Sequence, residues 1–167
     1  MNFRTKLVLI IALCLVNLSV KALETDRNMP IKIDSGSQSL DMERNIVTFS
    51  DNVVVTQGSI KLNAEKVTII RRDTQKELIE AFGTPVVFQQ TLDNGKIVNG
   101  TVNSIHYDFD SEFLILRGNA ELKQLDSAIK AEKITYDVKK QNLKATSNDR
   151  QRVKTVLIPN QLQSDKK

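Results

Sequence analysis

Apolar and polar side chains alternate with a period of two over most of the chain, between residues 31 and 158. In the segment Ile105–Phe109 every second side chain is apolar, and Val, Ile, Thr and Phe are frequent throughout. Both features are typical of β-strands that hide one face from water. Pairs with turn chemistry, such as Asn94-Gly95 and Gly118-Asn119, separate the runs. The pattern predicts about sixteen short strands, near residues 31–34, 38–43, 45–50, 52–57, 59–63, 65–71, 77–82, 85–91, 96–99, 101–109, 112–117, 119–124, 127–131, 133–138, 141–146 and 152–158.

Only the segment Gln75–Phe82 has a composition that also fits a helix. It is short, lacks a capping residue and runs into Gly83-Thr84-Pro85, so a strand is the better prediction. The chain shows neither heptads nor alternation of strands with helices. Because each strand has one apolar face to cover, we expect an all-β protein with two packed or folded-over antiparallel sheets.

The sequence repeats itself when it is shifted by 67 residues. Apolar positions then meet apolar positions, and six residues coincide in both copies. These are Asn52, Gln57, Ala64, Glu65, Lys66 and Thr68, which meet Asn119, Gln124, Ala131, Glu132, Lys133 and Thr135. Such repetition predicts an elongated structure in which similar hairpins stack on one another. No linker divides the copies, so we expect a single domain over residues 23–160, followed by a flexible polar tail at 161–167.

The first 22 residues have the features of a secretory signal peptide. Arg4 and Lys6 precede an apolar run over Leu7–Leu18, and Ala22 provides a small residue at the cleavage site. The run is too short for a spanning helix, which argues against the alternative of an uncleaved anchor. Bulky Leu13 before Cys14 argues against a lipoprotein.

Charge and cysteine content narrow the function. The full chain has a formal net charge of +4, and removal of residues 1–22 would leave 145 residues with a charge of +1. No basic stripe for a nucleic acid remains. The chain has one Cys and one His, which excludes a Cys/His zinc finger and an internal disulfide framework. Phosphate-binding glycine loops, metal-ligand spacings and nucleophile elbows are also missing from the sequence, so we expect no catalytic residue, no metal and no cofactor.

Two polar features could serve an enzyme: a histidine and a pair of aspartates. Alternation directs His106 away from the apolar face, so we expect an exposed, unpaired histidine. Asp108 and Asp110 share a strand face, and a carboxylate pair could cleave a polysaccharide. They lie beside a predicted turn without supporting groups, which favours a solvated role.

The apolar face is the more informative surface. It could be a close-packed core or a trough that stays open at both ends. The first and last strands are expected at opposite ends of the stack, where unpaired edges could join copies head to tail. The predicted edge residues are Ile31, Ile33, Val156 and Ile158.

Several motifs, in order and over essentially the whole chain after residue 22, resemble the OstA-like domain family of periplasmic lipopolysaccharide transport proteins. They are residues 38–42 (QSLDM), 47–49 (VTF), 51–58 (DNVVVTQG), 60–67 (IKLNAEKV), 93–96 (DNGK), 116–120 (LRGNA), 129–136 (IKAEKITY) and 153–159 (VKTVLIP). The link Arg71–Lys76 departs from the family, because it is charged and has no glycine.

The resemblance implies an open, twisted antiparallel β-jellyroll that binds lipopolysaccharide through its lipid A acyl chains. It implies a non-catalytic bridge of head-to-tail copies across the periplasm, from an inner-membrane export complex to an outer-membrane translocon. Family positions carried over to this chain, together with the apolar face, give the expected lipid-binding residues. These are Ile31, Ile33, Met42, Phe49, Phe88, Tyr107, Phe109 and Leu116. The alternative is an exported β-rich scaffold with a sealed core.

Overall fold

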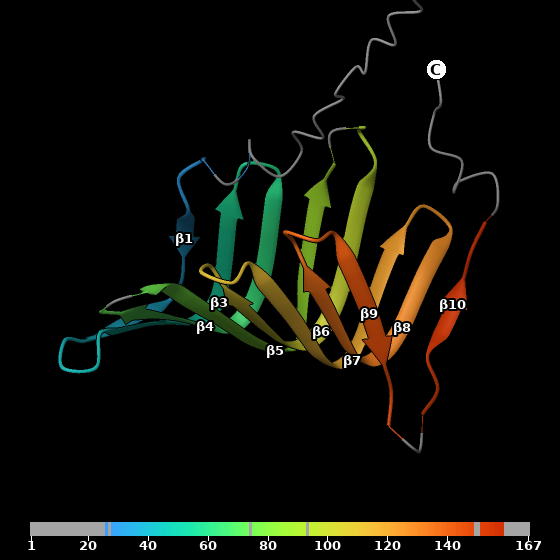
Figure 1. Ribbon diagram of the computed structural model, residues 1–167. Coiled ribbons are helices and arrows are strands. Elements are labelled where there is room, and N and C mark those ends of the chain that lie inside the picture. The colour runs from blue at the N-terminus through green and yellow to red at the C-terminus, as the bar shows by residue number, and fades with distance from the viewer. Residues whose placement is uncertain (1–25, 27, 74, 93, 149–150, 159–167) are drawn as a thin grey trace, which may run out of the picture.

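The computed structural model describes residues 26, 28–73, 75–92, 94–148 and 151–158. The predicted signal peptide 1–22 and tail 161–167 lie outside the described residues. Ten strands form one antiparallel sheet in the order β1-β3-β4-β5-β6-β7-β8-β10, with β2 also paired to β3 and β9 to β8 (Figure 1). The strands are β1 Lys32–Asp34, β2 Ser37–Asp41, β3 Ile46–Gln57, β4 Ile60–Arg72, β5 Gln75–Thr91, β6 Ile97–Asp108, β7 Phe113–Gln124, β8 Ser127–Asp137, β9 Asn142–Thr146 and β10 Lys154–Val156. The all-β prediction and the strand at residues 77–82 are confirmed.

The prediction of about sixteen short strands was wrong, because six pairs of predicted strands are single long strands. Residues 112–117 and 119–124, for example, both belong to β7. Gly118 and Asn119, which suggested a turn, adopt φ of 81° and 51° within that strand. Left-handed residues of this kind form a β-bulge as readily as a hairpin turn, and the alternation pattern does not distinguish the two.

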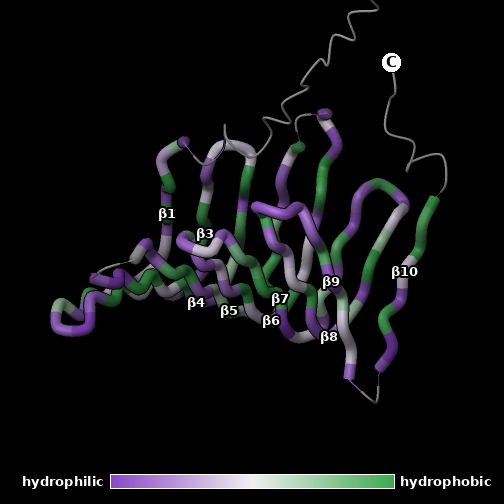
Figure 2. The backbone as a smooth tube through the Cα atoms, viewed as in Figure 1, coloured by the Kyte–Doolittle hydropathy of each residue, from purple (hydrophilic) through white to green (hydrophobic). Residues whose placement is uncertain are grey.

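Bulges at matching positions bend the sheet along one line. The register shifts once near the middle of each of the five pairings between β3 and β8, as between Ser50 and Val53 in β3. Figure 1 shows the long strands bending along their length, so that the sheet folds over into two arms. The structure therefore has the folded-over sheet of the two expected arrangements. Figure 2 shows hydrophobic and hydrophilic segments following one another along the long strands.

The buried core follows this bend. Eleven apolar residues are buried, and the largest of them include Leu116 and Ile134 at 2% and 1% exposure. Four of the eleven are alanines, whose small side chains let the two arms meet closely: Ala64, Ala81, Ala120 and Ala131. Burying one Leu or Ile side chain stabilises a fold by about 1.5–3 kcal/mol, so the line of the bend holds the arms together.

The 67-residue repeat is present in the fold. The shift carries β3 Ile46–Gln57 onto β7 Phe113–Gln124 and the start of β4 onto the start of β8. β1 and β2 together correspond to β6, whereas β9 and β10 together correspond to β5. The sheet thus consists of two repeats that join where β5 pairs with β6, and the outermost strand of each repeat is divided in two.

An ion pair ties two hairpin ends on the outer side of the sheet. Arg72 Nη1 lies 3.0 Å from Asp108 Oδ2, and Arg72 also donates hydrogen bonds to the carbonyl of Lys76. The other oxygen of Asp108 accepts backbone hydrogen bonds from Ser111 at 3.0 Å and Asp110 at 2.8 Å. The Ser111 N–H and the Arg72 guanidinium hold the pKa of Asp108 well below its usual range.

Asp108→Asn is expected to lower the free energy of unfolding by about 1–2 kcal/mol at pH 7, because it removes a charged hydrogen-bond acceptor. A carboxylate with a depressed pKa contributes stability that is present at neutral pH and is lost as the pH falls below about 4. Urea unfolding of both proteins at pH 7 and pH 3 should therefore show a smaller difference at pH 3. Exposed Asp110→Asn is the control and should match the wild type. Equal stability of Asp108→Asn and wild type at pH 7 would contradict this role.

Candidate functional site

Three rows of cross-strand neighbours define one side of the sheet, which we call the inner face. Each row runs from the β1/β2 edge to the β9/β10 edge and contains no charged side chain. The first row is Ile33, Val55, Leu62, Phe88, Gly100, Leu122, Ile129 and Thr155. The second row is Gln38, Phe49, Val67, Ala81, Ile105, Leu116, Ile134 and Ala145. The third row is Leu40, Val47, Ile69, Ile79, Tyr107, Leu114, Tyr136 and Leu143.

Burial divides the inner face into a base and two flanks. From Val67 to Ile134, the second row is at most 7% exposed. Between it and the first row lie six further buried residues, and together they form the base at the bend: Val53, Ala64, Val86, Val102, Ala120 and Ala131. The first and third rows pack against this base but are only partly buried, as Phe88 and Leu114 illustrate. Partly exposed apolar side chains on both sides of a buried base leave an apolar surface that a ligand can contact.

Glutamine side chains border the first row. By alternation, Gln57, Gln90 and Gln124 lie on the inner side of β3, β5 and β7, one step beyond the apolar row. Asp26 accepts hydrogen bonds from the Ser59 backbone N–H at 2.9 Å and from the Gln90 amide at 3.3 Å. The rim of the inner face is therefore polar, with uncharged glutamines on these strands and one carboxylate, that of Asp26, beside Gln90.

Five of the eight predicted lipid-binding residues lie on the inner face itself. Ile33 and Phe88 belong to the first row, Phe49 and Leu116 to the second, and Tyr107 to the third. Leu116 is only 2% exposed and therefore belongs to the base. The other four are partly buried and accessible.

The remaining three residues lie at the ends of strands. Phe109 follows β6, and its ring packs edge-on against Tyr107 with centroids 4.7 Å apart. Its backbone N–H donates to Glu77 at 3.2 Å, which extends the strand pairing by one step. Ile31, 39% exposed, directly precedes β1. The strand predicted over 38–43 ends at Asp41, so Met42 lies in the following turn with 80% of its surface exposed.

Other inner-face residues were not among the predicted sites. Ile79 stands opposite Tyr107, but its segment was the one that resembled a helix. Leu122 and Ile129 stand opposite each other in the first row and correspond to Val55 and Leu62 in the repeat. Combining the repeat with alternation would have identified them.

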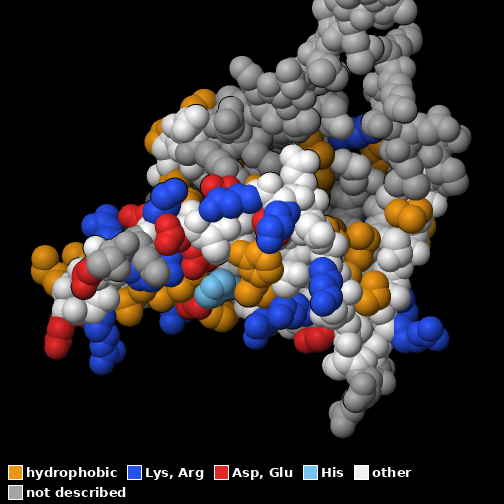
Figure 3. Space-filling model, viewed as in Figure 1, with side chains coloured by type: hydrophobic (Ala, Val, Ile, Leu, Met, Phe, Trp, Pro, Cys, Tyr) orange, Lys and Arg blue, Asp and Glu red, His pale blue; other side chains and the backbone are white. Residues whose placement is uncertain are grey.

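The groups weighed as enzyme residues lie on the outer face. His106 was expected to be unpaired, but its Nδ1 lies 3.2 Å from Glu80 Oε1 on the neighbouring strand. Alternation alone does not reveal which residue faces it across the strands. Asp108 is engaged by Arg72 and a turn, and Asp110 is exposed. Charged side chains of both signs spread over the face visible in Figure 3.

No grouping of His, Cys, Asp or Glu that could hold a metal ion occurs among the described residues. The described part of the chain also has no helix long and apolar enough to cross a membrane.

The two ends of the sheet are open edges. β1 and β10 lie at opposite ends of the strand order, as predicted. All three residues of β10 are exposed, and Val156 is 55% exposed. Beyond β10, the Ile158 backbone N–H donates to Ser127 Oγ at 3.2 Å, so the chain stays close to β8. Ile33 faces the inner side of β1, where it pairs with Val55.

Comparisons with known proteins agree with the motifs. The chain is 57% identical over 164 residues to the lipopolysaccharide export system protein LptA of Haemophilus influenzae, covering 96% of this chain and 95% of the relative. It is 46% identical over 170 residues to LptA of Escherichia coli K12, covering 98% and 92% of the two chains.

A solved structure and a family model extend the agreement. The crystal structure of LptH, described as the LptA homologous periplasmic component of the lipopolysaccharide transport device from Pseudomonas aeruginosa, superimposes with a TM-score of 0.70. The match covers 81% of this chain and 99% of that one at 27% identity. A family model described as LptA/(LptD N-terminal domain) LPS transport protein matches residues 32–142. The chain therefore belongs to the LptA/LptD N-terminal domain family of lipopolysaccharide transport proteins.

Proposed function

We propose that this chain is a non-catalytic periplasmic carrier that holds the acyl chains of lipopolysaccharide against its inner face. In this role it passes lipopolysaccharide from an inner-membrane export complex to an outer-membrane translocon. The observation that carries the proposal is the uncharged, partly exposed inner face, whose rows run without interruption from one open edge of the sheet to the other. Family membership supports the same cargo.

The physical need for such a face is large. Exposing one methylene to water costs about 0.8 kcal/mol, so an acyl chain of about twelve carbons costs on the order of 10 kcal/mol. A lipid with several such chains needs a covered path through an aqueous compartment. Rows of similar aliphatic side chains offer non-directional contacts of comparable strength at each step, so that the lipid is bound and also released.

The polar rim suits the other half of the cargo. With acyl chains on the first and third rows, the sugar groups of lipopolysaccharide would lie toward Gln57, Gln90 and Gln124 and the solvent. Amide groups donate and accept hydrogen bonds without favouring one charge.

Export and assembly complete the proposal. A cleaved signal peptide over residues 1–22 would deliver the chain to the periplasm. The open edges β1 and β10 would join copies head to tail, with Ile31, Ile33, Val156 and Ile158 at the contact. Such a contact is heterologous, so it extends the inner face from copy to copy rather than closing a dimer.

A photo-reactive residue tests where the lipid lies. Placed at Phe109, beside Tyr107, it should cross-link to purified lipopolysaccharide, because this position adjoins the third row. The same group at His106, on the outer face, should give no cross-link. Mass spectrometry of the irradiated complexes measures both. Cross-linking only at position 106 would contradict the proposal.

A charge at Phe109, which adjoins the third row of the inner face, should block capture without unfolding the sheet. We expect Phe109→Glu to weaken lipopolysaccharide binding at least about tenfold, because a carboxylate among acyl chains loses its hydration. The matched control is Phe82→Glu, since Phe82 is 44% exposed and faces outward opposite Lys66. Binding is measured on immobilised lipopolysaccharide, and circular dichroism checks the fold.

These variants separate the carrier from a sealed scaffold. A sealed core would bind no lipid and would unfold when Phe109 becomes Glu. Folded Phe109→Glu that binds as tightly as the wild type would exclude the surface around Phe109, at the end of the third row, as the lipid site.

A further inference from the structure

For the head-to-tail contact between β10 of one copy and β1 of the next, we propose a specific register, which is the one that β6 adopts on β5 within one copy. This register sets Asp34 of one copy opposite Lys154 of the next. The inference rests on the proposed head-to-tail assembly and specifies its geometry, its direction and the charge pair that selects it.

The repeat provides the template. Under the shift of 67 residues, β10 corresponds to Val87–Gln89 of β5, and β1 corresponds to Asn99–Thr101 of β6. Each edge strand pairs with its inner neighbour in the same register as its counterpart does. On β8, Lys154 pairs with Lys130, and the equivalent residues Val87 and Asn63 pair with each other in the first repeat. Likewise Asp34 pairs with Val54 as Thr101 pairs with Glu121. The two edges of the molecule therefore have the backbone positions of the β5–β6 junction.

Within one copy that junction has a defined pairing. Val87 stands opposite Thr101, Phe88 opposite Gly100 and Gln89 opposite Asn99. Carried to the edges, the same pairing sets Lys154 opposite Asp34, Thr155 opposite Ile33 and Val156 opposite Lys32 of the next copy.

Strand direction agrees with this pairing. Each step of the order β1-β3-β4-β5-β6-β7-β8-β10 is antiparallel, so β1 and β10 run in opposite directions. Figure 1 shows the two arrows pointing opposite ways. Copies stacked in one orientation along the sheet therefore meet antiparallel.

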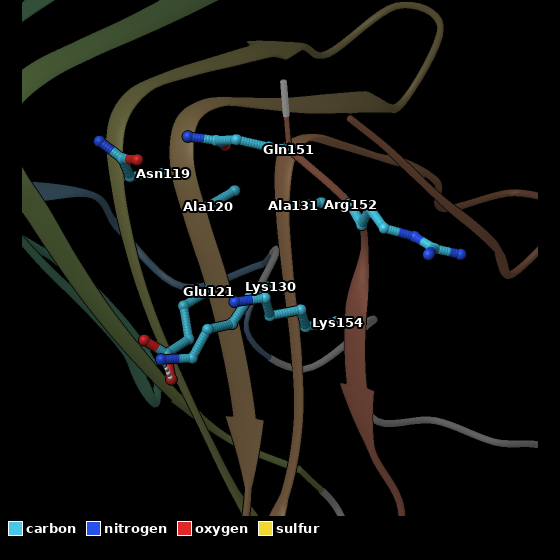
Figure 4. A pocket seen from close by; sticks show the side chains of 8 residues that line it. All are labelled: Asn119, Ala120, Glu121, Lys130, Ala131, Gln151, Arg152 and Lys154. Atoms are coloured by element: carbon cyan, nitrogen blue, oxygen red, sulfur yellow. Dashed lines mark ion pairs between the residues drawn. The ribbon is translucent and has the colours of Figure 1, made fainter. Parts of the chain in front are cut away.

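Among the described residues of its own copy, Lys154 has no counter-ion. Its cross-strand neighbour is Lys130, a like charge. The Nζ of Lys130 lies 3.2 Å from Glu121 Oε1 (Figure 4). The same oxygen of Glu121 lies 2.9 Å from Lys123 Nζ. These lysines hold the pKa of Glu121 below its usual range. Like charges on neighbouring strands are unfavourable, so an incoming carboxylate beside Lys154 would be stabilised.

The surroundings of Lys154 are cationic. Lys130, Arg152 and Lys154 line a hollow of ≈ 580 Å³, and Glu121 is the one carboxylate among the described residues that line it (Figure 4). The hollow at the equivalent bend of the first repeat is lined by uncharged Val54 and Asn63 where this one has Glu121 and Lys130. In the described residues 142–148 and 151–158, every charged side chain is a cation: Lys144, Arg152 and Lys154. A second β10 edge is therefore a poor occupant of this surface.

Asp34 carries the complementary charge on the other edge. Lys32 also lies on β1, but in this register it stands opposite the uncharged Val156. Asp34 is exposed and pairs across the sheet with Val54, which is uncharged.

Within the described part of the chain neither Asp34 nor Lys154 forms an ion pair. The counterparts of these two residues inside one copy, Thr101 and Val87, are uncharged. The charges thus occur where the junction lies between copies.

Side-chain size also fits this register. At the internal junction Phe88 lies over Gly100, where an added Cβ would overlap the Phe88 ring. Between copies, smaller Thr155 takes the place of Phe88 and larger Ile33 takes the place of Gly100. The exchange of large and small residues keeps the first row of the inner face filled across the contact.

Charge reversal tests the register. The protein, purified from the periplasm as exported, is compared by sedimentation velocity as wild type, Asp34→Lys, Lys154→Glu and the double variant. We expect each single variant to weaken association about tenfold and the double variant to recover to within about twofold of the wild type. Circular dichroism confirms folding, which both exposed edge positions should preserve.

Asp41→Lys combined with Lys154→Glu is the matched control. Asp41 is an exposed aspartate on β2 at the same edge, and its reversal should not rescue Lys154→Glu. A double variant of Asp34 and Lys154 no better than the worse single variant would overturn the register. Sensitivity to Asp34→Lys without sensitivity to Lys154→Glu would indicate β1 pairing with β1 and would also overturn it.

The outcome separates this inference from the proposed function. If charge reversal fails while photo-cross-linking at Phe109 still captures lipopolysaccharide, the carrier function stands and the register falls. A wild-type chain that stays monomeric at the highest attainable concentration would overturn the contact between copies as a whole.

Discussion

The fold depends on how one antiparallel sheet shields its apolar face when, among the described residues, no second layer covers it. The sheet bends along a line of bulges and brings its own arms together. The bend buries the second row, whereas the first and third rows remain partly exposed. A sandwich of two stacked sheets would bury all three rows. The bend therefore accounts for both the stability of the fold and the accessible apolar surface beside its base.

A second constraint is the open edge. The two repeats pair where β5 meets β6, but in the described part of the chain β1 and β10 each have a neighbouring strand on one side only. Long, regular, apolar edges invite unselective pairing. Here the terminal strands are short, and the outermost strand of each repeat is divided in two. Lys154 on β10 and Asp34 on β1 have opposite charges, although β1 also carries Lys32. Short edges with opposite charges favour pairing that is selective and reversible, as a chain of carrier molecules requires.

Much of this could be predicted from the sequence, because alternation and repetition are local or periodic signals. Alternation placed Ile33, Phe88 and Tyr107 on one face, and the 67-residue repeat appears as equivalent strands. The strand count failed where Gly118 and Asn119 form a bulge rather than a turn. His106 contacts Glu80, which lies 26 residues earlier in the sequence. The contact depends on how β5 pairs with β6, and alternation along one strand does not specify that pairing. Met42 was predicted within a strand, but in the structure that strand ends one residue earlier, at Asp41.

The central claim is that the inner face, and not the outer one, receives the acyl chains. The most direct measurement is methyl-resolved NMR of the protein bound to lipopolysaccharide, recording nuclear Overhauser effects between protein methyl groups and acyl methylenes. The account predicts contacts from Ile33, Leu62, Ile79 and Leu114 on the first and third rows. It predicts none from Ile46, Ile70 and Leu78, which line up across the outer face. Contacts from the outer set, or none from the inner set in a lipid-bound sample, would contradict it.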